Sequence, residues 1–368
     1  MKKTNFLSMA LAAIMTCAGF TACGDDDNNS TNNSQSQQQQ ENFAKYMTQV
    51  ETQVKAKKSA SKNTKALLLV AFGSTWENAH QSFAELVKSY ENDTKFKGYD
   101  VYFAFTSAKC INRSRMGETY KKSVDFYAPN FWLEAIGRQQ YAEVRVQSLH
   151  VIPGEEYLRL RDNYVKDFKN NINADLDDAY LERVKIYVGG PLMDQEEDVA
   201  TLAQALHGLF RQYVQGGNAM VFMGHGNPAT LNYGNGNQRY TQLEEALQKY
   251  SPNYYVATVD MEGNLLDDLW GRMQQNSNLK TDGSSTITLH ALMCIAGDHA
   301  HNDMSGIENA SDSWREFFQQ QGFKCQYNGN DADASNNCIL KGLSDYDAIR
   351  NIWKNHTVQA EDMFPAEE

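Results

Sequence analysis

The sequence predicts an α/β protein with two lobes, each built on a parallel sheet flanked by helices, and a cleft between the lobes. One observation is the continuous apolar run that begins at Ala66 and ends at Gly73, which is typical of a strand buried on both faces. Another is the alternation of strand-like and helix-like patterns, which indicates parallel sheets. The alternation restarts after residue 192, so we expect a first lobe over residues 63–192 and a second over residues 193–368.

Each expected strand is an apolar run bounded by glycine or polar residues. In the first lobe these runs cover residues 66–74, 99–107, 143–150 and 184–190. Helical periodicity lies between them, over residues 77–92, from the second strand to about residue 140, and over 155–170. In the second lobe strands are expected at 219–223, 254–259 and 286–293, and helices at 195–215, 240–250, 264–275 and from about residue 311. Ligands of parallel sheets bind beyond the carboxyl ends of the strands, so functional side chains are expected there.

The first residues have the pattern of an export signal. Met1-Lys2-Lys3 is positively charged, and residues 6–14 form an apolar run too short to span a bilayer. The segment that ends at Cys23 (FTAC) resembles a lipobox, in which the cysteine is lipidated and becomes the mature N-terminus. The alternative is a soluble exported protein cleaved near Ala18 or Ala22. We expect a signal peptide over residues 1–22, and a lipidated Cys23 followed by a tether to residue 62, which is flexible to about residue 40 and then charged and helical at first, still before the core.

Charge and cysteine content limit the partners and the location. The formal net charge of -12 argues against nucleic acid. The acidic tract Gly24-Asp25-Asp26-Asp27 resembles the one that sends some lipoproteins to the outer face of the outer membrane. The protein is therefore expected in the periplasm or at that surface, with a lipid anchor as its contact with the membrane. No CxxC pair occurs among the six cysteines, which argues against a thiolate metal site, while Cys325 and Cys338 flank an Asn-rich loop where a local disulfide is plausible.

Three strand ends of the second lobe carry chemistry. His225 lies between two glycines after the first strand, Asp260 and Glu262 follow the second, and His299 follows the third. A single histidine at a strand end is more often a structural residue, but three such positions together favour a site. Two imidazoles and a carboxylate suit a borderline divalent ion such as Co²⁺, Fe²⁺, Ni²⁺ or Zn²⁺.

These segments resemble the signature blocks of the anaerobic sirohydrochlorin cobaltochelatases, class II tetrapyrrole chelatases of the early-insertion vitamin B12 route. The resemblance covers residues 65–355. Its blocks are residues 221–226 (VFMGHG), 292–304 (LMCIAGDHAHNDM), 71–74 (AFGS), 104–107 (AFTS), 147–157 (QSLHVIPGEEY) and 312–314 (DSW). It implies two Rossmann-like lobes with the tetrapyrrole in the cleft between them.

The resemblance also implies roles for individual residues. His225 and His299 would be metal ligands, and one of them would also take protons from the pyrrole nitrogens. The third ligand of the family is a glutamate directly after a Thr-Val strand end, whereas here Thr258-Val259 is followed by Asp260 and, two residues later, by Glu262. Both side chains would lie on the same face of an extended segment, so both remain candidates. The longer side chain and the Glu-Gly pair favour Glu262.

Further residues near these blocks are candidates for the surroundings of the metal and the ring. Ser74 and His150 are expected to line the cleft, and Lys109 and Arg113 either to bind the carboxylate arms of a tetrapyrrole or to be solvated cations. Asp298, His301 and Asp303 would orient the ligating imidazoles, or else cap a turn or lie at the surface.

The function predicted is insertion of Co²⁺, with Fe²⁺ or Ni²⁺ as alternatives, into sirohydrochlorin or a related tetrapyrrole, as in anaerobic cobalamin biosynthesis. No nucleotide-binding motif occurs, so no nucleotide cofactor is expected. Export favours a different candidate, a cell-surface lipoprotein that captures haem or a cobalt-tetrapyrrole for iron or corrinoid acquisition. Removal of iron from haem is a third. A homo-oligomer is compatible with each of them.

Overall fold

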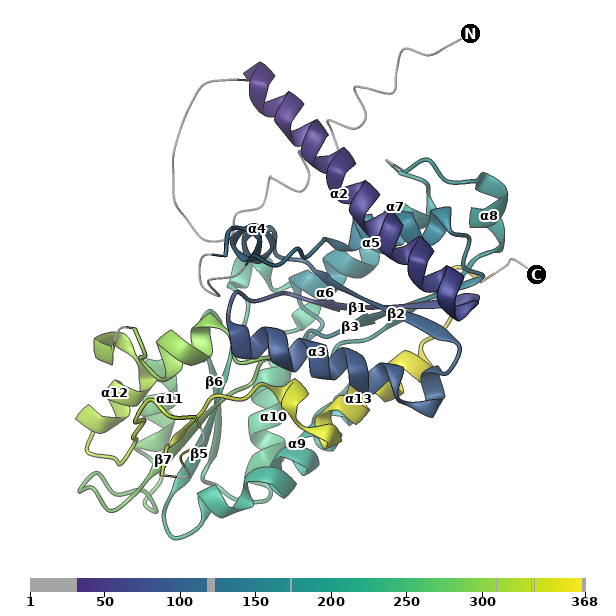
Figure 1. Ribbon diagram of the computed structural model, residues 1–368. Helices are drawn as coiled ribbons and strands as arrows, with labels where there is room; N and C mark the ends of the chain where they lie inside the picture. Colours follow the sequence, from purple (N-terminus) through teal and green to yellow (C-terminus); the bar gives the residue numbers. More distant parts are fainter. Residues whose placement is uncertain are drawn as a thin grey trace.

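The protein forms two α/β lobes that lie side by side (Figure 1). The computed structural model describes residues 32–117, 123–172, 174–308, 310–331, 333 and 335–365. Within these residues each lobe contains a 4-stranded parallel sheet, with strand orders β2-β1-β3-β4 and β6-β5-β7-β8. The predicted fold class, two lobes with parallel sheets flanked by helices, is confirmed.

The first lobe holds the elements from β1 to β4. They are β1 (Lys65–Ala71), α3 (Glu77–Glu91), β2 (Tyr99–Phe105), α4 (Ala108–Met116), α5 (Pro129–Arg138), β3 (Glu143–Ser148), α6 (Glu155–Arg159), α7 (Lys166–Lys169), α8 (Asp178–Arg183) and β4 (Lys185–Gly189). The single helix expected from the second strand to about residue 140 is two helices. The first ends at Met116 and is followed by Gly117, whose φ of 70° is left-handed, and the second begins with Pro129, a residue suited to a first helical turn.

The second lobe begins with α9 and repeats the strand order of the first. Its elements are α9 (Glu196–Phe210), β5 (Ala219–Gly224), α10 (Gln238–Gln248), β6 (Tyr254–Thr258), α11 (Leu266–Met273), β7 (Ile287–Ala291), α12 (Trp314–Gln320), β8 (Cys338–Ile339) and α13 (Asp347–Gln359). A π-helical turn, Ala300–Met304, follows β7. Strand β8 has only two residues, too few for a period to be recognised in the sequence.

The central strands are buried on both faces, which explains their continuous apolar runs. In β1, Leu67 and Leu69 belong to one apolar cluster, whereas Leu68 and Val70 belong to another on the opposite face. In β5 every residue from Ala219 to Gly224 is buried. Side chains alternate across a strand, so such a strand needs apolar residues at every position.

The last helix crosses back from the second lobe to the first. Helix α13 packs against β3 and β4, and its Trp353 is fully buried. Beyond it, the Met363 backbone N–H donates to the Ile186 carbonyl at 2.8 Å. Figure 1 shows α13, in yellow, running along the side of the first lobe. Residues 193–368 therefore do not form one lobe as expected, because their C-terminal part packs on the other sheet.

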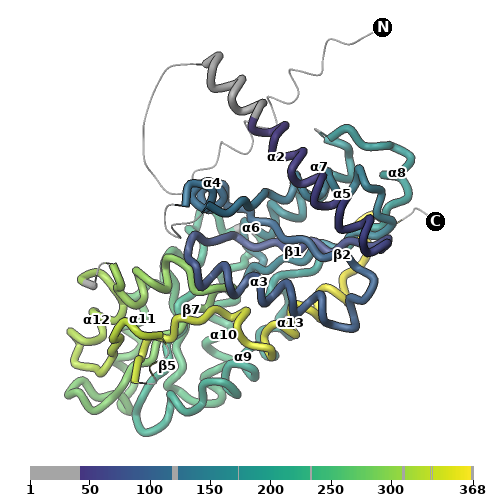
Figure 2. Tube along the Cα trace, viewed as in Figure 1, coloured from purple at the N-terminus to yellow at the C-terminus, as the bar shows by residue number. Residues whose placement is uncertain are grey.

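Helix α2 (Asn32–Ser61) precedes the first sheet and lies along the first lobe (Figure 2). Met47, Val50 and Val54 are buried in the same apolar cluster as β1 and β3, because spacings of three and four residues place them on one face of the helix. A helix was expected from residue 41, but as part of the tether before the core, whereas in the structure it packs on the first lobe. The expected signal peptide and Cys23 lie outside the described residues.

Two general expectations can be compared with the described residues. Nowhere in the ranges given above is there a helix with the length and apolar character needed to cross a membrane. Cys110, Cys294, Cys325 and Cys338 are all free thiols, so the plausible bridge between Cys325 and Cys338 is not formed in this structure. These two thiols are buried, and burial together with the neighbouring Cys338 raises the pKa of Cys325.

Candidate metal centre

His225 stands at the carboxyl end of the central strand β5, between two glycines. A Cβ on Gly224 would lie 2.4 Å from the ring of Tyr240, and one on Gly226 would lie 2.8 Å from Met261. Gly226 also has a φ of 78°, a left-handed conformation that glycine adopts without strain. Both neighbours of His225 are therefore packed tightly into the lobe, while the histidine side chain itself is 47% exposed.

The hydrogen bonds of His225 leave one ring nitrogen for a metal. Its Nδ1 lies 2.7 Å from the Gly226 carbonyl oxygen, and a carbonyl can only accept, so Nδ1 carries the proton. The lone pair is then on Nε2. Partial burial, together with the neighbouring His299, lowers the pKa of His225 and favours the neutral imidazole that a metal requires.

His299 lies just before the π-helical turn that follows β7. Its Nδ1 pairs with the carboxylate of Asp303, one turn further along, which again leaves the Nε2 lone pair for a metal. Burial opposes the charged form, but the bond to Asp303 outweighs it and raises the pKa of His299. The ring centroids of His225 and His299 are 4.9 Å apart, with the ring planes at 81°. The structure thus brings together two histidines that are 74 residues apart in the chain.

Of the two candidate carboxylates, only Asp260 lies beside a histidine. Its Oδ2 is 3.6 Å from His225 Nδ1, and its backbone N–H donates to the His225 carbonyl at 2.9 Å. Glu262 is exposed at the corner of a turn closed by the Asn264 N–H and the Met261 carbonyl at 3.1 Å. That turn has Gly263 at φ 78°, which accounts for the Glu-Gly pair without a ligand role.

The two imidazoles and Asp260 do not form a closed ligand shell. Over the described ranges, no group of three His, Cys, Asp or Glu side chains has the arrangement of a metal site. The ligand set of His225, His299 and either Asp260 or Glu262 therefore stays a prediction.

Two of the three residues expected to orient the imidazoles instead contact the first lobe. The ring of His301 stacks on Trp76, with centroids 3.9 Å apart, and its Nε2 accepts from Asn78 at 3.2 Å. Asp298 accepts from the Trp76 indole N–H at 3.2 Å. Only Asp303 bonds to a candidate ligand. Trp76 was not singled out in the sequence, because nothing in its local pattern marks a contact with residues more than 200 positions away.

Further candidates lie just beyond the carboxyl ends of β1 and β3 in the first lobe. Ser74 is buried, and a Cβ on Gly297 would lie 3.5 Å from its Oγ, so the two lobes touch here. His150 pairs through Nδ1 with Ser148 Oγ at 2.8 Å. Its buried Nε2 has no partner among the described residues. Burial lowers the pKa of His150 to about 4, so this imidazole is neutral.

Glu156 connects these two sides electrostatically. Its carboxylate favours protonation of both His150 and His225, and it accepts from Arg159 at 3.1 Å. Glu156 lies in the block of residues 147–157, so that block could have identified it in the sequence. Lys109 and Arg113 lie one turn apart on α4, and both are exposed. Helix α4 follows β2 directly, which places both cations at the carboxyl edge of the first sheet.

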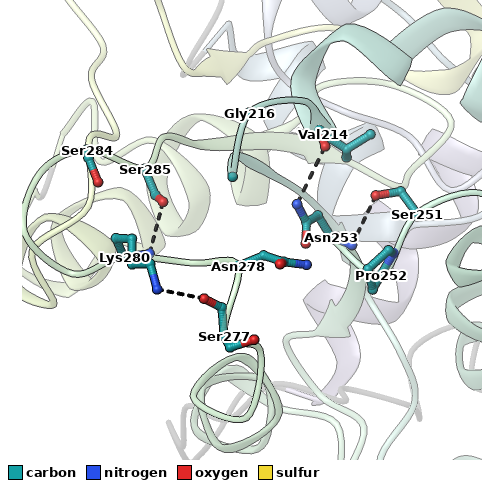
Figure 3. Close-up of a pocket in the computed structure, with 11 residues that line it drawn as sticks. Val214, Gly216, Ser251, Pro252, Asn253, Ser277, Asn278, Lys280, Ser284 and Ser285 are labelled. Atoms are coloured by element: carbon teal, nitrogen blue, oxygen red, sulfur yellow. Dashed lines mark hydrogen bonds between the residues drawn. The ribbon is translucent and has the colours of Figure 1, made fainter.

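A polar depression of ≈ 610 Å³ lies at the opposite end of the second lobe (Figure 3). Its lining includes Gly216, Asn253 and Ser285, which precede β5, β6 and β7. Lys280 donates there to the Ser277 carbonyl at 2.8 Å. The amino ends of parallel strands are not where such sheets bind ligands, so this depression is separate from the histidine site.

The chain is similar to two sirohydrochlorin cobaltochelatases and to one solved structure. The sirohydrochlorin cobaltochelatase CbiKC of Nitratidesulfovibrio vulgaris (Hildenborough) is 29% identical over 304 residues, which is 80% of this chain and 90% of that protein. The sirohydrochlorin cobaltochelatase of Salmonella typhimurium is 27% identical over 311 residues, 81% of this chain and 97% of that protein. Among solved structures, SirB from Bacillus subtilis with Fe3+ has a TM-score of 0.49 at 14% identity, covering 80% of this chain and 96% of its own.

The family relationship extends over both lobes. The cobalt chelatase (CbiK) family matches residues 65–362, from the first residue of β1 to beyond the end of α13. Because this match spans well over half of the sequence and includes both histidines, the chain belongs to the cobalt chelatase (CbiK) family and is a metal chelatase.

Proposed function

We propose that this protein inserts a divalent metal ion, Co²⁺ in the first place, into sirohydrochlorin or a closely related tetrapyrrole held between the lobes. The observation that carries the proposal is the pair His225 and His299, with ring centroids 4.9 Å apart and Nδ1 of each already bonded to an oxygen. The Nε2 lone pair of His225 can then bind the ion, and that of His299 can bind the ion or take a pyrrole proton. Two relatives that match this chain over most of their own length are sirohydrochlorin cobaltochelatases. They support the choice of ring and metal.

The reaction needs a metal ion and a place for two protons. As the divalent ion enters, the ring loses the protons of two pyrrole N–H groups, so charge balances without any redox step. His225 is the neutral imidazole and suits the ligand role, whereas the His299–Asp303 pair has the higher affinity for a proton and suits the acceptor role. Asp260, 3.6 Å from His225, supplies a negative charge that helps attract the cation.

The substrate ring carries several carboxylates, which the net charge of -12 would repel. Lys109 and Arg113 at the edge of the first sheet would offset that repulsion by pairing with acetate or propionate arms. Neither the metal nor the ring calls for a nucleotide.

The proposal extends to the location. We infer from the sequence that the protein is exported and lipidated on Cys23, so that it works in the periplasm or at the outer-membrane surface. Labelling cells with a fatty acid would transfer label to the natural chain and not to a Cys23→Ser variant. Label on both would contradict the anchor at Cys23.

The decisive experiment follows the absorption spectrum of sirohydrochlorin as Co²⁺ is added to the purified protein. His225→Ala and His299→Ala should each lower the insertion rate by roughly 100-fold, because each removes a ligand or a base. His207→Ala is the matched control: His207 lies on α9, pairs with Tyr254 at 3.0 Å and is remote from the cleft, so its rate should stay near that of the natural protein.

A different result would replace this function. If the protein binds haem tightly and metallates no free ring, capture of a finished metallotetrapyrrole is its activity. Undiminished insertion by both histidine variants would exclude the proposed site.

A further inference from the structure

An aromatic side chain occupies the first-lobe position that corresponds to His225. Strand β1 lies between β2 and β3 just as β5 lies between β6 and β7, so the two strands are equivalent in the repeated sheets. The residue directly after β1 is Phe72, and the residue directly after β5 is His225. Each is followed by a glycine with positive φ, Gly73 at 119° and Gly226 at 78°.

Phe72 is exposed although the strand before it is buried. Its side chain is 48% exposed, whereas Ala71 is 2% exposed. The backbone that follows packs closely on the core, since a Cβ on Gly73 would lie 2.8 Å from the Phe105 ring. Single exposed apolar residues are common at protein surfaces, but Phe72 lies beyond the carboxyl end of the central strand, where parallel sheets bind their ligands.

The loops that follow β1 and β3 both contact the second lobe. Two residues after Phe72, Ser74 approaches Gly297, and then Trp76 stacks on His301. In the loop after the neighbouring strand β3, a Cβ on Gly154 would lie 2.5 Å from Asn227 Nδ2. Phe72, directly after β1, therefore lies at the end of the first sheet that meets the second lobe.

We propose that Phe72 is the surface on which one face of the tetrapyrrole ring rests while His225 and His299 act on the other face, where the metal enters. This inference rests on the proposed function and adds a residue that determines ring affinity. A flat conjugated ring stacks well on a phenyl face, and it would cover the apolar area that Phe72 leaves exposed. The first lobe then supplies the apolar contact with the ring, and the second lobe supplies the histidines.

The test measures ring binding without metal, by titrating the full chain into metal-free sirohydrochlorin and following the ring fluorescence. Phe72→Ala should weaken binding about tenfold, the effect of losing one good aromatic contact, and Phe72→Tyr should stay within about twofold. In insertion assays Phe72→Ala should raise KM for the ring while kcat at saturating ring stays within about twofold. Tyr250→Ala is the control, because Tyr250 is also 48% exposed but stacks on His207, away from the cleft.

The outcomes separate this inference from the function on which it rests. If the natural protein binds no metal-free ring, the proposed function fails, and the role of Phe72 fails with it. If it binds the ring and Phe72→Ala binds equally well, the function stands and the role of Phe72 is overturned. Equal weakening by Phe72→Ala and Tyr250→Ala would also overturn it. Ring binding that is lost in Phe72→Ala but kept in His225→Ala would support both.

Discussion

The two lobes have the same strand order and differ in what stands at the strand ends. After β1 come Phe72 and Gly73, and after β5 come His225 and Gly226. After β2, Ser107 caps a helix by accepting from the Cys110 N–H at 3.2 Å, whereas Asp260 after β6 faces a histidine. The strands of both sheets are apolar because they are buried on both faces. The residues just beyond each strand are not buried in this way, so they need not be apolar. Chemistry can therefore differ between lobes while the scaffold stays the same.

The largest difference between the lobes is expected when the two equivalent glycines, Gly226 and Gly73, are changed. Gly226→Ala would place a Cβ 2.8 Å from Met261 in a left-handed backbone, so we expect His225 to shift away from Asp260 and insertion to fall by roughly 100-fold. Gly73→Ala meets the Phe105 ring at the same distance and should lower the melting temperature, yet keep kcat within about threefold. Insertion rates and thermal unfolding of both variants would check this. Equal losses of kcat would show that the lobes share the metal chemistry.

A smaller effect separates the two carboxylates of the second lobe. Asp260→Asn should lower the insertion rate about tenfold at limiting Co²⁺, because it removes the charge beside His225. Glu262→Gln should change the rate less than twofold, since Glu262 is exposed at a turn. Rates measured over a range of Co²⁺ concentrations would distinguish them. The reverse order would mean that the turn moves and that Glu262 reaches the metal.

The smallest effect concerns a contact that joins the lobes. On α13, His356 pairs through Nε2 with Asp198 of α9 at 3.0 Å. Burial opposes its charge, but the bond to Asp198 prevails and raises the pKa of His356. The charged pair of His356 and Asp198 therefore stabilises the fold fully below the pKa of histidine in the unfolded chain, about 6.5. This stabilisation is lost as pH rises through the higher pKa of the folded state.

The matching variant is His356→Gln, which keeps a hydrogen bond and removes the titration. Between pH 6 and pH 8.5, the free energy of unfolding measured with denaturant should fall by about 1 kcal/mol more for the natural protein than for the variant. Parallel pH profiles would show that the charged pair does not stabilise the junction of the lobes.

Much of the fold was predictable because buried parallel strands have a continuous apolar pattern. The run expected at residues 254–259 is β6, Tyr254–Thr258, and the expected helix 77–92 is α3, Glu77–Glu91. Periodicity says less about where an amphipathic helix docks. The packing of α13 on the first sheet depends on contacts between distant segments, which no short stretch of the sequence reveals.

The site, too, could be predicted only in part from the sequence. His225 and His299 were recognisable as strand-end residues, and the structure places their rings next to each other. Sequence spacing left both Asp260 and Glu262 as candidates, and the longer side chain and the Glu-Gly pair favoured Glu262. The turn at Gly263, which leaves Glu262 exposed, could not be inferred from that spacing. The stacking of Trp76 on His301 joins two lobes across the cleft, so it could not be inferred from either segment by itself.

Helix α2 has a practical consequence for anyone who prepares fragments of this protein. It lies before residue 65, where the family match begins, yet Val50 and Val54 are fully buried against the first lobe and Arg138 of α5 pairs with Glu51 at 3.0 Å. A fragment cut at the family boundary would expose an apolar strip and should aggregate. Limited proteolysis should accordingly leave α2 attached to the chelatase core.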